Sequence, residues 1–524
     1  MYKKISFLLF FNILLVGAEL DYGQVFTDDT EFFGRVLANK ILLDDPHSTV
    51  VFGRDGAQHN VPSCQVKDVC PKAIIENLKD NSDLINALNQ ITIIGCGYVG
   101  LTMAALFSEV VPKIICFDIN QEKINSLKHQ KISIFEPGLS ELLFEANTSH
   151  HLIFTDNLLD AMQSNIFFIC VPTPSDKNGH CDCTYLFKAF DNILDNCDID
   201  EEKIICVKST VSPGTMEKLC GRLKKSNHNN IHLVYNPEFM REGSALYDVR
   251  HRNPVVLASK SQGSLQTVEF MYLKMLSSTP YVNFIKTNFA SAEMIKYAWN
   301  SFSAIRLAYV NELAFLCRKL GGNIYHIIRG LALSEELLPT KDLTPGPGYG
   351  GSCLPKDTRG FSKILEHEGF NESMVHQAIR SNARHVSHLI NDIFSQLDDP
   401  MENKTVALLG LSFKANTNDI RNSPALLIID ALQKKGITIK AFDPKAADEM
   451  RNFFPQVTYC SCPYEAVTDA DCIVVLTEWD EIKHLDLGRM ANICRQKILI
   501  DTRNLFDVQD LKKWEYTYIN MGKL

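Results

Sequence analysis

A cysteine in a glycine-rich loop is the first candidate for chemistry in this chain of 524 residues. Cys353 lies in GGSCLPKD, whereas most other cysteines lie in apolar runs typical of strands and helices. Lys356 and Asp357 follow it, and such a setting can lower the pKa of a thiol toward neutrality. We therefore expect Cys353 to act as a nucleophile. The alternative is an unreactive loop thiol.

Two further pairs of polar residues have a spacing that suits catalysis. Lys296 and Asn300 are spaced i, i+4 in a helical pattern, so both side chains could reach one reacting oxygen. Glu238 and Glu242 have the same spacing in NPEFMRE, after a strand-like run and a proline, and one could act as general base for water. Solvated surface residues are the ordinary alternative for both pairs.

A glycine pattern predicts a dinucleotide site. Gly95, Gly97 and Gly100 form G-x-G-x-x-G between the strand-like run ITII and the helical run LTMAALFSEVV. These glycines permit a tight turn, close approach of a pyrophosphate and close helix packing. Asp118 ends the next strand-like run, where its carboxylate can bind ribose hydroxyls and repel a 2′-phosphate. The pattern therefore favours NAD over NADP.

The elements that must position these residues alternate apolar strand-like runs with helical patterns, which is typical of an α/β fold. We predict an NAD-binding domain over 91–290, a central helical region with the cysteine loop over 291–400, and a second sheet domain over 401–524. The fold is thus two Rossmann-like, doubly wound parallel-sheet domains joined by a long central helix. Residues 21–90 form an extension that no motif connects to chemistry.

Composition and charge exclude some classes of protein. The net charge of −9 gives no basic surface for nucleic acid, so we predict no such partner. Sixteen scattered cysteines suit a reducing compartment better than a disulfide framework. Two groups with C-x-C spacing could be considered as metal ligands, but without a matching second pair we predict no metal site: His180, Cys181 and Cys183, and Cys460 with Cys462.

The first twenty residues carry a different signal. Lys3 and Lys4 precede the apolar run FLLFFNILLVGA, a pattern typical of a secretory signal or short anchor. An enzyme that uses NAD belongs where NAD is found, so we predict a cytoplasmic protein. Export or a membrane tether through residues 1–20 is the alternative.

The order of the motifs resembles the UDP-glucose 6-dehydrogenases of the UDP-glucose/GDP-mannose dehydrogenase family. The shared motifs run from residue 91 to the C-terminus: ITIIGCGYVG, VPTP, KSTVSPGT, NPEFMREGSA, AEMIKYAWNSF, PGPGYGGSCLPKD, LGLSFKANTNDIRNSP, AFDP, LTEWDE and DTRN. The resemblance implies NAD as cofactor, a nucleotide sugar as substrate and a homodimer or larger assembly through the central helix.

The resemblance also implies roles for individual residues. The catalytic set is Cys353 as nucleophile, Lys296 and Asn300 on the reacting oxygen, Asp357 beside the cysteine, Glu238 as base for hydrolysis and Thr210 on a water. The cofactor set is Gly95, Gly97, Val99, Gly100, Asp118, Lys123, Thr173, Thr210, Glu242, Lys356 and Arg421. The substrate set is Glu238, Phe239, Met240, Arg241, Glu242, Lys296, Asn300, Tyr349, Gly350, Lys414 and Arg503. From the sequence itself, Lys414 and Arg421 already lie in the first loop of the second sheet, where they could meet phosphate or ribose or simply face solvent.

The implied reaction oxidises a sugar CH2OH to a carboxylate through a thiohemiacetal and a thioester on Cys353. One departure concerns the substrate: many UDP-glucose enzymes carry Asp-x-Arg-Ile-Gly before the cysteine, whereas this chain has SEELLPTKD. Lys341 could substitute as a point charge without the bidentate fork of arginine. GDP-mannose 6-dehydrogenase is therefore an alternative, and UDP-N-acetylhexosamine enzymes, which typically carry GGHC, are less favoured. A non-catalytic nucleotide-sugar-binding protein and a single-step hydroxyacid dehydrogenase are the other classes considered.

Overall fold

The computed structural model describes a defined part of the chain. The described residues are 50–52, 58–60, 65–69, 71, 75, 88–197, 201–226, 228–251, 254–279, 282–333 and 343–523. The chain divides into two compact units, 1–65 and 66–524. In the first, β1 (Val50–Phe52) pairs antiparallel with β2 (Gln58–Asn60). The signal-like segment 1–20 and Lys341 lie outside the described residues.

The second unit begins with a nine-stranded sheet of order β3-β11-β10-β9-β8-β7-β4-β5-β6. Its strands are β3 (Gln65–Val69), β4 (Gln90–Ile94), β5 (Lys113–Phe117), β6 (Leu152–Thr155), β7 (Ile166–Ile169), β8 (Lys203–Val207), β9 (Ile231–Tyr235), β10 (Val255–Ser259) and β11 (Val282–Thr287). The six strands from β4 to β9 are mutually parallel, whereas β10 runs antiparallel to β9.

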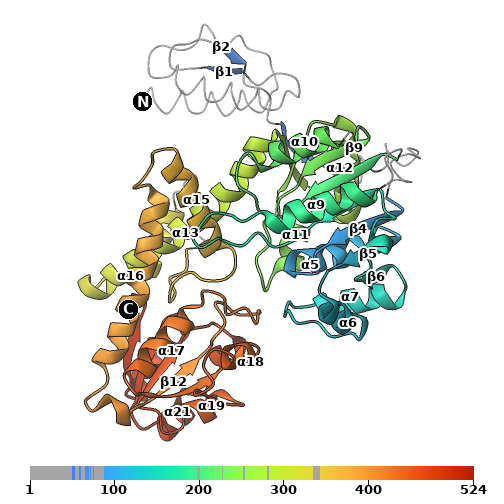
Figure 1. Ribbon diagram of the computed structural model, residues 1–524. Helices are drawn as coiled ribbons and strands as arrows, with labels where there is room; N and C mark the ends of the chain where they lie inside the picture. The colour runs from blue at the N-terminus through green and yellow to red at the C-terminus, as the bar shows by residue number, and fades with distance from the viewer. Residues whose placement is uncertain are drawn as a thin grey trace, which may run out of the picture. The chain divides into compact units, whose positions relative to one another are not determined.

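Helices cover both faces of this sheet (Figure 1). They are α5 (Tyr98–Phe107), α6 (Gln121–Lys128), α7 (Leu139–Thr148), α8 (Leu158–Ala161), α9 (Thr184–Asn196), α10 (Thr215–Lys225), α11 (Ala245–His251) and α12 (Gln262–Met275). Successive strand residues point to opposite faces, so Ile93 packs with α5, α7 and α12, while Ile94 packs with α9 and α10. Burial on both faces explains why the strands read as continuous apolar runs.

A helix of 32 residues, α13 (Phe289–Leu320), follows the first sheet. The Asn288 side chain caps its start by accepting from the Ser291 N–H, and Gly321, with φ of 72°, ends it. At 1.5 Å per residue the helix is about 48 Å long. The helices α14 (Ile324–Ala332), α15 (Leu354–His367) and α16 (Met374–Ser395) follow, and α15 and α16 pack against α13.

The second sheet has six strands, all in parallel pairs, in the order β14-β13-β12-β15-β16-β17. The strands are β12 (Thr405–Leu409), β13 (Thr438–Phe442), β14 (Thr458–Tyr459), β15 (Cys472–Val475), β16 (Ile498–Asp501) and β17 (Thr517–Asn520). Its helices are η3 (Met401–Asn403), α17 (Pro424–Lys434), α18 (Ala447–Arg451), α19 (Pro463–Val467), α20 (Asp480–Lys483), α21 (Leu487–Ile493) and α22 (Val508–Lys513). The predicted fold class, two Rossmann-like domains joined by a long helix, is confirmed.

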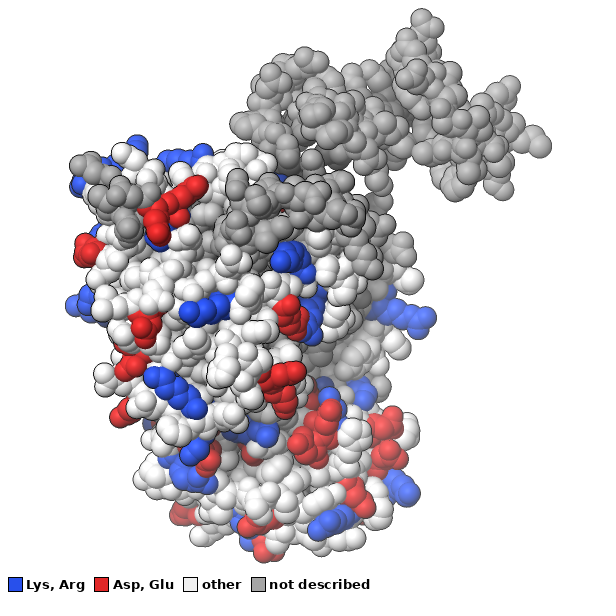
Figure 2. Space-filling model, turned by 90° about the vertical axis from the view of Figure 1, so that its right-hand side faces the viewer, with Lys and Arg blue, Asp and Glu red and all other residues white. Residues whose placement is uncertain are grey.

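On the face in Figure 2, Lys and Arg side chains are interspersed with Asp and Glu side chains. Within the described residues, every helix is too short or too polar to cross a membrane.

Candidate active site

The glycine turn joins β4 to the start of α5. Gly95 has φ of +100°, and a Cβ on Gly100 would lie 1.9 Å from the Gly95 carbonyl oxygen, so both positions require glycine for the fold. Gly97 is different, because a Cβ there would meet no described atom within 4 Å. The open side of Gly97, at the N-cap of α5, fits the pyrophosphate of a dinucleotide.

Asp118 follows β5 beside this turn. Its carboxylate accepts from the Cys96 N–H at 2.9 Å, from the Asn120 N–H at 3.0 Å and from Lys123 Nζ at 2.9 Å. The side chain is thereby held at the carboxyl edge of the sheet, where ligands of doubly wound folds bind. The predicted cofactor residues Gly95, Gly97, Asp118 and Lys123 thus form one continuous arrangement.

Thr173 and Thr210 come from the loops after β7 and β8. The Thr173 hydroxyl donates to the Thr210 carbonyl oxygen at 2.7 Å, which joins the two loops at the same edge of the sheet. Adjacent parallel strands end at one edge, so two residues distant in sequence become neighbours.

Lys296 and Glu238 form a buried ion pair. Lys296 Nζ lies 2.9 Å from Glu238 Oε1, donates also to the Glu238 carbonyl oxygen and lies 5.2 Å from the centre of the Phe239 ring. The two side chains are only 2% and 8% exposed. Burial opposes the charged forms of both, but their mutual attraction prevails: the pKa of Lys296 is raised and that of Glu238 lowered. Both groups are therefore ionised near neutral pH.

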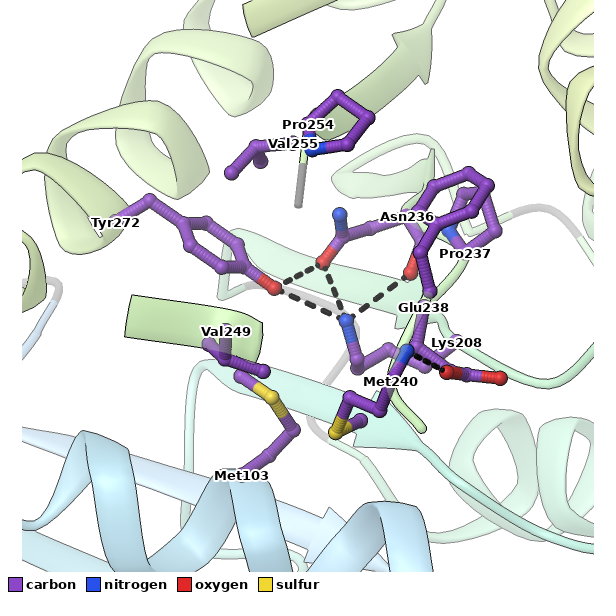
Figure 3. Close-up of a pocket in the computed structure, with 11 residues that line it drawn as sticks. Met103, Lys208, Asn236, Pro237, Glu238, Met240, Val249, Pro254, Val255 and Tyr272 are labelled. Carbon is purple, nitrogen blue, oxygen red and sulfur yellow. Dashed lines mark hydrogen bonds between the residues drawn. The ribbon is translucent and has the colours of Figure 1, made fainter. Parts of the chain in front are cut away.

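A buried lysine anchors the segment that carries Glu238. Lys208 follows β8, and its Nζ donates to the Tyr272 hydroxyl at 3.0 Å and to the side-chain and main-chain oxygens of Asn236 at 3.1 and 3.3 Å (Figure 3). The Met240 N–H donates to Glu238 Oε2 at 2.6 Å, as the same view shows. Sequence reasoning missed Lys208, because its partners are 28 and 64 residues away.

Asn300 and Asp357 meet behind the cysteine loop. Asn300 Nδ2 donates to Asp357 Oδ2 at 2.5 Å, and Lys356 Nζ donates to Asp357 Oδ1. The Asp357 N–H donates to the carbonyl oxygen of Cys353, the N-cap residue of α15, at 2.8 Å. Asp357, which is 1% exposed, therefore ties α13 to the loop that carries the thiol.

The expectation that the neighbours of Cys353 lower its thiol pKa is wrong. Burial and, after it, the negative charge of Glu238 raise the pKa of Cys353 to about 11, and Lys296 offsets only part of the rise. Lys356, close in sequence, bonds to Asp357 instead of the sulfur. The resting thiol is thus protonated at neutral pH.

Ser352, which sequence reasoning also missed, connects the thiol to a carboxylate. Its hydroxyl lies 3.4 Å from Cys353 Sγ and donates to Glu242 Oε1 at 2.8 Å. An ionised carboxylate only accepts, so the serine proton points to Glu242 and its lone pairs remain for the thiol. Burial and the nearby Asp419 raise the pKa of Glu242 to about 7. Arg421 approaches Glu242 at 3.4 Å and also binds Asp419.

The remaining substrate candidates differ in their surroundings: one lies near Glu242, and others are occupied by contacts elsewhere in the fold. Lys414 is close enough to Glu242 and Arg241 for their charges to affect its pKa, which burial lowers. The guanidinium of Arg241 makes a bidentate bond to Asp248 at 2.8 and 2.7 Å. Gly350 packs tightly, since a Cβ there would lie 2.4 Å from the Asn422 carbonyl oxygen.

Arg503 and Tyr349 are fixed by contacts of their own. Arg503 donates to the carbonyl oxygens of Leu476 and Phe413 at 2.9 and 3.0 Å. Tyr349 is 7% exposed, and its N–H donates to Asn382 at 2.8 Å. Hydrogen bonds and electrostatic contacts bring together Cys353, Lys296, Asn300, Asp357, Lys356, Glu238, Glu242 and Arg421. Arg503 forms an ion pair with Glu478 at 3.0 Å, and the charge of Glu478 also acts on Lys414.

Comparison with known proteins places these geometries in context. Three family models match in chain order: the NAD binding domain of the UDP-glucose/GDP-mannose dehydrogenase family at 89–276, its central domain at 290–384 and its UDP binding domain at 407–508. The chain is 35% identical to a UDP-glucose 6-dehydrogenase of Bacillus subtilis, with 83% of this chain and 94% of the relative covered. It is 34% identical to a UDP-glucose 6-dehydrogenase of Rickettsia conorii, over 82% of this chain and 99% of the relative.

Solved structures of nucleotide-sugar dehydrogenases are also similar to this chain. A UDP-glucose dehydrogenase from Pyrobaculum islandicum has a TM-score of 0.73 at 27% identity, with 83% of this chain and 98% of that chain covered. A UDP-N-acetyl-mannosamine dehydrogenase from Staphylococcus aureus has a TM-score of 0.68 at 26% identity, again over 83% and 98%.

Proposed function

Because the chain belongs to the UDP-glucose/GDP-mannose dehydrogenase family, we propose that it oxidises UDP-glucose to UDP-glucuronate through covalent intermediates on Cys353. It is an NAD-dependent nucleotide-sugar 6-dehydrogenase. The observation that carries the covalent scheme is one cluster in which a partly exposed thiol lies near a buried ammonium group and two buried carboxylates, from α13, the Glu238 loop and the start of α15.

NAD, when bound, accepts a hydride in each of the two oxidation steps. The open side of Gly97 and the carboxylate of Asp118 would hold it, with Val99, Thr173, Thr210, Lys356 and Arg421 as further contacts. Asp118 is proposed to bind ribose hydroxyls and to disfavour a 2′-phosphate.

Cys353 attacks the aldehyde that the first oxidation leaves. Its proton passes to the Ser352 oxygen while the serine proton passes to Glu242, whose raised pKa suits a proton acceptor near neutral pH. Cys353 is the N-cap residue of α15, and the N-terminus of this helix stabilises the thiolate once formed. The resting thiol therefore stays protonated until this transfer occurs.

Lys296 and Asn300 stabilise the oxyanion of the thiohemiacetal. The lysine contributes a charge-assisted hydrogen bond and the asparagine a neutral one, and removing one such donor typically costs about 10²–10³ in rate. Asp357 holds the Asn300 amide at 2.5 Å, so it positions this donor. The second oxidation gives the thioester.

Glu238 assists the hydrolysis of the thioester. Its lowered pKa keeps the carboxylate ionised, which is the form that accepts a proton from water. The same lowered pKa makes it a weak base while Lys296 is its partner. Thr210 would help to hold the water. The segment Glu238 to Glu242, with Tyr349, Gly350, Lys414 and Arg503, is proposed to contact the nucleotide sugar.

The choice of sugar rests on the relatives, which are named UDP-glucose 6-dehydrogenases at 34–35% identity. The segment SEELLPTKD, which lacks the family arginine, keeps GDP-mannose as the second candidate. We propose a cytoplasmic location, where both cosubstrates occur. We also propose a homodimer through α13, whose Trp299, Phe302, Tyr309 and Leu320 are 45–80% exposed apolar side chains of the kind that interfaces cover.

The test compares NADH release with UDP-glucose, UDP-N-acetyl sugars and GDP-mannose. We expect two NADH per UDP-glucose, and no net oxidation in Cys353→Ser. Cys462→Ser, which removes an exposed cysteine, is the matched control and should retain full activity. One NADH per sugar with aldehyde as product would contradict the thioester scheme, and turnover of GDP-mannose alone would reverse the choice of sugar.

A further inference from the structure

Two cysteines outside the proposed catalytic set lie against each other beside the cysteine loop. Cys181 Sγ is 3.8 Å from Cys183 Sγ, in the C-x-C segment that leads into α9. Cys181 is partly exposed, and Cys183 is buried at the N-cap of α9. Cys181 is therefore the more exposed residue of the pair, and Cys183 is the buried one.

A small hairpin fixes this pair. The Asp182 N–H donates to the Pro174 carbonyl oxygen and the Asp176 N–H to the His180 carbonyl oxygen, both at 2.8 Å. An isolated β-bridge joins Ser175 and Cys181. The two thiols are thus held together by backbone bonds on both sides, so their closeness does not depend on side-chain rotamers alone.

The surroundings distinguish the two sulfurs. A hydrogen bond from Cys183, the positive charge of Lys356 and a hydrogen bond with Tyr297 lower the pKa of Cys181 to about 6, against the effect of burial. The same hydrogen bond and burial raise the pKa of Cys183. An accessible thiolate with a protonated thiol in contact is the arrangement of an attacking and a resolving cysteine.

We propose that Cys181 and Cys183 are a modification site that hydroperoxides oxidise to a reversible disulfide, and that this disulfide weakens NAD binding. The Cys181 thiolate attacks the peroxide: an S–O bond forms, the O–O bond breaks, and the peroxide is reduced to water or an alcohol. Cys183 then attacks the Cys181 sulfur, the S–S bond forms, and water leaves with the proton of Cys183. Two electrons pass from the two sulfurs to the peroxide.

The expected effect on NAD binding follows from the contact between Cys181 and Thr210, which formation of the disulfide would change. The sulfurs must approach from 3.8 Å to about 2.05 Å. Cys181 Sγ also lies 3.7 Å from the Thr210 carbonyl oxygen, the same oxygen that accepts from Thr173. Closure therefore alters the contact between Cys181 and Thr210, which the proposed function assigns to the cofactor together with Thr173, and this part of the inference rests on that function.

Peptide mapping tests the disulfide without any enzymatic assay. The full-length protein is treated with hydrogen peroxide, alkylated and cleaved with trypsin. The tryptic peptide 178–188 contains Cys181 and Cys183 as its only cysteines. We expect this peptide to appear two hydrogen atoms lighter and unalkylated, and to return to the dialkylated form after treatment with a thiol reductant.

The second C-x-C segment of the chain is the matched control. Cys460 directs its sulfur to the Thr458 carbonyl oxygen at 3.8 Å, and Cys462 is exposed. We expect the first pair to oxidise about tenfold faster or more, as its thiolate character predicts. In Cys183→Ser the reaction should stop at a sulfenic acid on Cys181 that dimedone traps, and Cys181→Ser should give no product in this peptide.

NAD binding is measured by titration of the reduced and oxidised protein. We expect oxidation to weaken binding about three- to tenfold, the factor for one ordinary hydrogen bond, and Cys181→Ser to abolish this response. Equal oxidation of both C-x-C segments, or a disulfide from Cys181 to another cysteine, would overturn the site. A disulfide that leaves NAD affinity unchanged would overturn the coupling. A protein that fails to bind NAD in the reduced state would instead contradict the proposed function.

Discussion

Replacing Gly97 with alanine should separate cofactor binding from folding. Gly97 has φ of −88° and ψ of −167°, which alanine adopts without strain, and the added Cβ meets no described atom within 4 Å. At such a compatible position alanine stabilises by about 0.4–1 kcal/mol, because it restricts the unfolded chain. The same methyl group occupies the place where a pyrophosphate approaches the backbone. We expect NAD affinity to fall about tenfold or more, which corresponds to about 1.4 kcal/mol.

Gly100→Ala is the matched control, because its added methyl group disturbs the fold and not the approach of the cofactor. Its Cβ would lie 1.9 Å from the Gly95 oxygen, and relieving that overlap costs about 1–3 kcal/mol or more, a large part of a typical stability of about 5–15 kcal/mol. Urea unfolding and NAD titration of both variants give the two quantities. A Gly97→Ala protein that binds NAD like the wild type, or that loses stability like Gly100→Ala, would refute this assignment of the two glycines.

Three other outcomes follow from the site. Glu238→Gln should release two NADH per active site in a burst and then turn over about 10²–10⁴ more slowly, as rapid-quench kinetics would detect; an unchanged steady state would remove Glu238 from hydrolysis. Asp118→Ser should lower the ratio of kcat/KM for NAD to that for NADP, and an unchanged ratio would exclude Asp118 as the selecting charge. Glu136 is a buried carboxylate that accepts from the Gly243 and Ala245 N–H groups. Burial raises the pKa of Glu136 and Glu242 from 4.5 to about 7 in the folded state, so their contribution to stability is complete below pH 4.5 and lost as pH rises through about 7. The free energy of unfolding in urea, measured across this pH range, should show that loss. Glu136→Gln should make the free energy of unfolding depend less steeply on pH.

Local patterns predicted the elements of the fold well. The runs ITII and IICF became β4 and β5 because buried parallel strands are apolar on both faces, and the long helical periodicity became α13. The antiparallel direction of β10 was not predictable, since VVLAS carries no mark of its direction. Direction depends on how the connecting segments cross the sheet, which the residues of one strand do not encode.

The site was predictable as a set of residues but not as a set of contacts. Lys356 was expected to act on the thiol of Cys353, yet its long side chain turns to Asp357, and burial decides the pKa of the sulfur. Ser352 gave no signal, because its partner Glu242 is 110 residues away and their meeting depends on tertiary packing. Pairings of this kind become visible only in the folded structure.

The helix α13 belongs to two hydrophobic cores at once. Phe289 and Ala292 are part of the core beneath the first sheet, while Val310, Ala314 and Cys317 are part of the core of the second. Lys296 therefore lies on a helix that packs into both domains. Unfolding of either domain would disturb the other through this helix. Heat should accordingly inactivate the dehydrogenase and unfold both sheets in a single step. A fragment limited to the dinucleotide-binding half would lack residues proposed for the sugar and would lose the packing that the second core gives to the end of α13.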